Sequence, residues 1–61
     1  MAPKTRNAIL EIYRREKRSL SPKEAAVLSR VNPNTARRAV RELAKIGALR
    51  KIEGTRVYNA T

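Results

Sequence analysis

Residues 21–47 read SPKEAAVLSRVNPNTARRAVRELAKIG and contain two helix start signals in close succession. The first, Ser21-Pro22-Lys23-Glu24, combines an N-cap serine, a proline at the first helical position and a glutamate that completes a capping box. The second, Asn32-Pro33, pairs an N-cap with another proline. The first signal predicts a short helix that ends near Ser29, so about three residues separate the two helices. Such a connection is typical of a helix-turn-helix.

The helix predicted from Pro33 to Ile46 separates its side chains into two faces. At about 100° per residue, one face is apolar and consists of Ala36, Ala39, Val40, Leu43, Ala44 and Ile46. The other face carries Asn34, Arg38, Arg41 and Lys45, flanked by Thr35 and Glu42 on one side and by Arg37 on the other. A solvated surface helix can show the same segregation, but three cations in line with one acid at the edge favour nucleic-acid binding. Gly47 suits the left-handed residue that ends a helix.

Two further elements flank this pair of helices. The spacing of apolar residues predicts a helix over Pro3–Lys17, and Leu20 is expected to be buried in the connection that follows it. After Gly47, the segments 48–52 and 55–58 enclose Glu53-Gly54 and predict a β-hairpin. The residues expected to dock this hairpin onto the helices are Leu49, Ile52, Val57 and Tyr58. The sequence therefore predicts one domain over residues 1–61, mainly α with a small β-hairpin, in the order α-α-α-β-β.

Composition restricts the function classes. The 61 residues include 15 Lys+Arg, 5 Asp+Glu and neither Cys nor His, which gives a net charge of +10. Without Cys or His there is no disulfide, thiol nucleophile or imidazole base, and the five glutamates are dispersed along the chain. We therefore expect no enzyme, catalytic residue, metal or cofactor. The positive charge indicates a polyanionic partner.

The same sequence indicates an intracellular location. Residues 1–6, MAPKTR, are not followed by the apolar stretch of a signal peptide. The longest wholly apolar run, 25–28, is far too short to cross a bilayer. We expect a soluble cytoplasmic protein without a membrane partner, associated with the nucleoid if it binds DNA.

From about Ile9 to Thr61, nearly the whole chain, the sequence resembles the winged helix-turn-helix superfamily, in particular the DNA-binding heads of MarR-, GntR- and ArsR-type transcription regulators. The matching residues are Ala25-Ala26, Asn32-Pro33-Asn34-Thr35, Arg37-Arg38, Val40-Arg41-Glu42-Leu43, Gly47, Leu49, Gly54 and Val57-Tyr58. Arg30 stands where family members often carry glycine. The resemblance implies duplex DNA binding by a small transcription regulator or an architectural protein. The chain has no C-terminal dimerisation helix, so a monomer or weak homodimer is expected.

A second resemblance leaves an alternative open. From Leu20 to Thr61 the chain is similar to the winged-helix ribosomal protein of the archaeal and eukaryotic small subunit. The similarity is carried by Ala36-Arg37, Val40-Arg41-Glu42-Leu43, Gly47 and the segment 58–61. It implies binding to rRNA, through backbone and shape, because the A-form major groove excludes a helix.

In the DNA-binding interpretation the polar residues have two roles. The candidates for base edges are Asn34, Thr35, Arg38 and Arg41, since Asn suits adenine and Arg suits guanine. The candidates for phosphate contacts are Arg37, Lys45, Lys23, Arg50, Lys51 and Arg56. Backbone N–H groups beside Ser21 could also donate to a phosphate. A single-strand binder would need more stacking aromatics than Tyr13 and Tyr58 supply.

Overall fold

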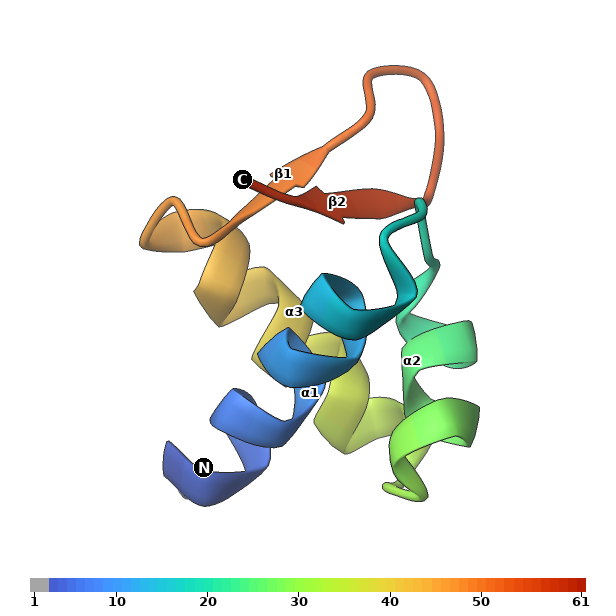
Figure 1. Cartoon of the computed structure of the whole chain (residues 1–61), viewed down its shortest axis with the longest axis vertical. Coiled ribbons are helices and arrows are strands. Elements are labelled where there is room, and N and C mark those ends of the chain that lie inside the picture. Colours follow the sequence, from blue (N-terminus) through green and yellow to red (C-terminus); the bar gives the residue numbers. More distant parts are fainter. Residues whose placement is uncertain (1–2) are drawn as a thin grey trace.

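The computed structural model describes residues 3–61 and contains three helices followed by two strands. The elements are α1 (Pro3–Glu16), α2 (Pro22–Ser29), α3 (Pro33–Lys45), β1 (Leu49–Lys51) and β2 (Tyr58–Ala60). Figure 1 shows the helices gathered together and the hairpin lying across one end of them. The predicted order α-α-α-β-β is confirmed, and the helices begin and end within one residue of the predicted positions.

Both predicted caps form at the helix starts. The Glu24 N–H donates to Ser21 Oγ at 3.2 Å, and the Ser21 N–H donates back to Glu24 Oε1 at 3.0 Å, which completes the capping box of α2. At α3, the Asn34 N–H donates to Asn32 Oδ1 at 2.8 Å. Each cap satisfies N–H groups that the first turn of a helix leaves without a partner. Local hydrogen bonding therefore sets where α2 and α3 begin.

The core lies between the three helices and the first strand. Its buried residues are Ile9, Ile12, Tyr13, Leu20, Ala25, Ala26, Ala36, Ala39, Val40, Leu43 and Leu49. The alanines allow α2 and α3 to approach closely, while the larger side chains of α1 and α3 fill the centre. Leu20 is fully buried, as predicted. On the predicted apolar face of α3, four residues are buried: Ala36, Ala39, Val40 and Leu43. Ala44 is half-buried, and Ile46, which follows the end of the helix at Lys45, is 63% exposed.

The first strand lies within the predicted segment 48–52, whereas the second lies further along the chain than the predicted 55–58. The strands pair in antiparallel register with Leu49 opposite Ala60 and Lys51 opposite Tyr58, and a six-residue connection spans 52–57. Within it Gly54 has a φ of 78°, so the glycine turn is present. The expectation that Ile52 and Val57 dock onto the helices was wrong. The Ile52 N–H donates to the Val57 carbonyl at 3.0 Å, so these residues close the connection while Leu49 and Tyr58 contact the core.

A contact outside the hairpin fixes its orientation. Leu20, between α1 and α2, forms an isolated antiparallel bridge with Tyr58. The Tyr13 hydroxyl donates to the Leu20 carbonyl at 2.9 Å, and burial raises the pKa of Tyr13 above its ordinary value of 10.0, so the hydroxyl remains a donor. The hairpin is therefore tied to the start of α2 as well as to α3. These contacts set the positions of the hairpin cations relative to the cations of α2 and α3.

Candidate nucleic-acid interface

The outer face of α3 presents the predicted polar row to solvent. Its exposed members are Asn34, Arg37, Arg38, Arg41 and Lys45, whereas Thr35 is half-buried. Ala36, Ala39, Val40 and Leu43 hold the opposite face in the core. Because these four side chains are buried, the helix cannot rotate to hide its cations. This polar row, called the ridge below, is therefore a fixed surface feature.

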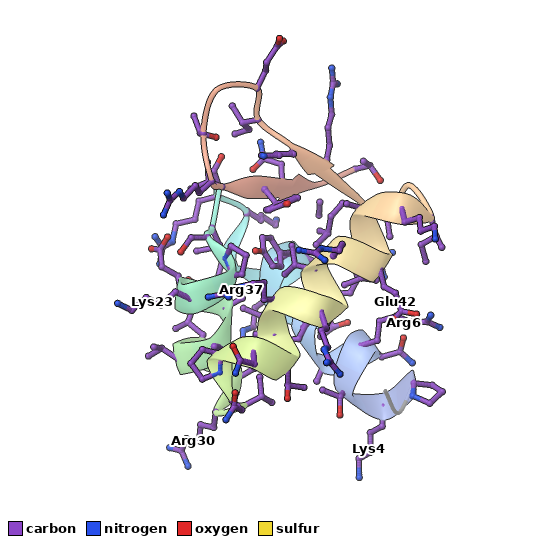
Figure 2. The ribbon with its side chains drawn as sticks, turned by 180° about the vertical axis from the view of Figure 1, so that it is seen from behind. Lys4, Arg6, Lys23, Arg30, Arg37 and Glu42 are labelled. Atoms are coloured by element: carbon purple, nitrogen blue, oxygen red, sulfur yellow. The ribbon has the colours of Figure 1, made fainter. Side chains whose placement is uncertain are left out.

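A cleft joins this ridge to the hairpin and to the start of α2. It has a volume of about 570 Å³. Its lining residues are Ser21, Pro22, Lys23, Arg37, Arg41, Lys51, Arg56 and Tyr58. The five cations among them come from three segments, and each was proposed from the sequence as a nucleic-acid contact. Figure 2 shows Lys23 and Arg37 on the same side of the molecule, on neighbouring helices.

A second, smaller hollow lies on the other side of the ridge. It has a volume of about 370 Å³ and is lined by Arg38, Arg41, Glu42 and Lys45. Arg41 borders both hollows, so the ridge divides into Arg37 on the cleft side and Arg38 with Lys45 on the far side. Glu42 forms an ion pair with Arg6 of α1 at 3.9 Å, and Figure 2 shows these two residues side by side.

Ion pairing within residues 3–61 is confined to two arginines outside this interface. The pairs are Arg6–Glu42, Arg18–Glu16 and Arg18–Glu24. None of the cations predicted to contact nucleic acid has a carboxylate within 4.0 Å: Lys23, Arg37, Arg38, Arg41, Lys45, Arg50, Lys51 and Arg56. Carboxylates are absent from the lining of the cleft, whereas Glu42 borders the second hollow beside Arg38, Arg41 and Lys45. No acidic side chain in the cleft lining therefore lowers its positive potential.

The carboxylate beside the cleft is directed elsewhere. Glu24 accepts the hydrogen bond from the Ser21 N–H, and this bond lowers the pKa of Glu24 below its usual value. Its other oxygen lies 3.7 Å from Arg18 Nη1. Ser21 Oγ only accepts in the capping box, so its own proton remains free to donate. Glu24 is not among the residues that line the cleft.

Not all predicted site residues come together. Arg50 does not line the cleft and instead borders a separate hollow with Lys51, Ile52, Glu53 and Asn59. Asn34 and Thr35 border neither basic hollow. They lie in the first turn of α3, toward the end of the molecule away from the hairpin.

Three of the cleft residues, Ser21, Pro22 and Tyr58, were not among the side chains predicted from the sequence to contact nucleic acid. Ser21 and Pro22 were predicted as the start of a helix, with only backbone N–H groups beside Ser21 expected near a phosphate, and Tyr58 was expected to dock the hairpin onto the helices. Tyr58 is half-buried, and it both packs against the core and lines the cleft. A cap position next to a basic residue was the available signal for Ser21, whereas nothing local distinguishes Tyr58 from a core tyrosine.

Compared with protein-family models, curated proteins and solved structures, the chain shows no significant match. Among residues 3–61, no helix combines the length and apolarity required to cross a bilayer. Over the same residues, no three His, Cys, Asp or Glu side chains gather where they could hold a metal ion. The function must therefore be inferred from the charged face itself.

Proposed function

We propose that the protein binds double-stranded DNA, with α3 in the major groove and the hairpin along the adjacent backbone. The observation that carries this proposal is the face formed by α3, the start of α2 and the hairpin, where every cation lacks a carboxylate partner. An exposed helix fits the width of the B-form major groove. The proposed role, as a small transcription regulator or an architectural protein, implies a cytoplasmic location and no catalytic step.

Within this proposal the two sides of the ridge have different tasks. Arg38 is exposed on the side away from the cleft and suits a bidentate contact to guanine. Asn34 and Thr35, in the first turn of α3, suit base edges near the helix N-terminus. Arg37, Lys23, Lys51 and Arg56 are grouped as phosphate contacts, with Lys45 and Arg50 at the margins. Arg41 borders both regions, so it is the base-contact candidate whose position also suits a phosphate.

The salt dependence of duplex binding tests the proposal. Neutralising about five to seven phosphates gives a slope of log K against log salt of about −5 to −6. Titration of a fluorescent duplex at several salt concentrations measures this slope. A slope near zero would remove the proposal. As a matched control, Lys4→Gln/Arg15→Gln removes two exposed charges from α1 and should change the slope less than Arg37→Gln/Lys45→Gln.

Competition between duplex DNA and structured RNA at fixed salt separates DNA binding from the ribosomal alternative. Preference for duplex DNA supports the proposal, and preference for structured RNA together with co-sedimentation with ribosomal subunits at high salt supports rRNA instead. Random-site selection on duplex DNA at about 0.15 M salt then distinguishes a regulator, which enriches a motif, from an architectural binder, which does not.

A further inference from the structure

The cleft between α2, α3 and the hairpin concentrates positive charge in a way that a flat contact surface does not require. Five cations surround about 570 Å³, and no residue of the lining is acidic. A volume of this order lies within the range of small-molecule sites, about 300–1,000 Å³. Small multivalent anions therefore have room to enter the cleft without any duplex.

Electrostatics favours an anion in this position. The like charges of Arg37, Arg41 and Lys51 repel one another, and water and salt reduce that repulsion only in part. A bound polyanion would replace repulsion by attraction and raise the stability of the fold by mass action. Arginine holds phosphate oxygens with paired hydrogen bonds, while the lysines contribute point charges.

The neutral residues of the lining are compatible with phosphate. Ser21 keeps a hydroxyl proton available, because its oxygen only accepts within the capping box. The start of α2 adds the positive end of a helix to the charges of the side chains. Tyr58 and Pro22 supply the remaining wall. These groups come from segments that the Leu20–Tyr58 bridge holds together, so the cleft exists before a ligand arrives.

We propose that this cleft is a binding site for two or three linked phosphate groups, presented either by a nucleic-acid backbone or by a free oligophosphate. The inference goes beyond duplex binding, because a free anion can occupy the cleft without contact to a base. The chemistry recognised is the phosphate chain itself.

Thermal unfolding of the full chain tests the site with inorganic tripolyphosphate as the probe. Tripolyphosphate should raise the Tm of the wild type above the value in sodium chloride of equal ionic strength. In Arg41→Gln/Lys51→Gln the shift should be several-fold smaller. Both side chains are exposed, so the fold should be retained, which far-UV circular dichroism checks. Lys4→Gln/Arg15→Gln loses the same charge outside the cleft and should keep the wild-type shift.

Two results would contradict the proposed phosphate site. One is a wild-type Tm that does not exceed the sodium chloride value. The other is an equal loss in the cleft and control variants, since this would indicate attraction by net charge alone.

Duplex titrations identify the source of the phosphate. If the backbone uses the cleft, tripolyphosphate displaces a fluorescent duplex, and the cleft variant loses about one unit of salt slope for each phosphate contact removed. If tripolyphosphate stabilises the protein but the slope is unchanged, the site belongs to a free oligophosphate. If no duplex binds at any salt concentration while tripolyphosphate still stabilises, duplex binding fails and the cleft remains.

Discussion

Leu20 and Tyr58 exchange two backbone hydrogen bonds across 38 residues of sequence. The Tyr58 N–H donates to the Leu20 carbonyl at 2.8 Å, and the Leu20 N–H donates to the Tyr58 carbonyl at 3.0 Å. Ser21, which caps α2, follows Leu20 directly, so this bridge places the second strand beside the start of α2. It thereby brings Lys51 and Arg56 of the hairpin to the same cleft as Lys23.

The Tyr13 hydroxyl reinforces this bridge. Tyr13→Phe removes the 2.9 Å hydrogen bond to the Leu20 carbonyl, which keeps the bond from the Tyr58 N–H. We expect the free energy of unfolding to fall by about 1 kcal/mol, because the carbonyl is not left unpaired. Urea unfolding followed by circular dichroism measures the change. Tyr58→Phe is the control and should have a smaller effect, and an unchanged stability for Tyr13→Phe would contradict the assigned bond.

Arg30 ends α2 in a left-handed conformation, with a φ of 58° and a ψ of 38°. A side chain is strained there, whereas glycine is not, although glycine costs more backbone entropy on folding. We expect Arg30→Gly to raise the free energy of unfolding by about 0.5–1 kcal/mol. Arg30→Ala keeps a Cβ in the same conformation and should give no gain. Equal gains in both variants would show that removal of positive charge, rather than backbone strain, is responsible.

The capping box makes stability depend on Glu24 at low pH. The hydrogen bond from the Ser21 N–H lowers the pKa of Glu24 in the folded state below its ordinary value of 4.5. Its contribution is therefore present above that value and is lost as the pH falls through the lower folded pKa. We expect Glu24→Gln to reduce the loss of Tm on acidification from about pH 5 to pH 3. A loss of Tm in Glu24→Gln as large as in the wild type would refute the assignment.

Arg38 is the α3 arginine that lies clear of the cleft. If it contacts guanine with two hydrogen bonds, Arg38→Ala should weaken binding to the preferred duplex by about 1–3 kcal/mol and relax the preference at one base pair. Arg37→Ala should instead weaken binding to all duplexes and make the salt slope shallower by about one unit. Binding titrations with the selected site and its single-base variants measure both effects. A uniform loss for Arg38→Ala would assign it to a phosphate and favour an architectural protein.

Local chemistry made the helices predictable from the sequence. Each cap joins residues two or three positions apart, as in Ser21 with Glu24 and Asn32 with Asn34. The polar ridge of α3 follows from helical periodicity alone, so Arg38, Arg41 and Lys45 could be assigned to one face without coordinates. The left-handed conformation of Gly47 was predictable because a glycine directly after a helix commonly ends it in this way.

The hairpin and the cleft depended on contacts between distant segments. Local turn signals located Gly54 and the first strand but not the second, which covers Tyr58–Ala60 instead of lying within 55–58. Tyr58 pairs with Leu20, a residue in a distant segment that no local signal indicates. Which of the 15 basic residues share a cleft depends on how α2, α3 and the hairpin pack around one buried core. Caps and helical periodicity involve residues only a few positions apart, so they can be recognised in the sequence. The spatial grouping of charge arises only when burial of Tyr13, Leu20 and Leu49 brings those elements together.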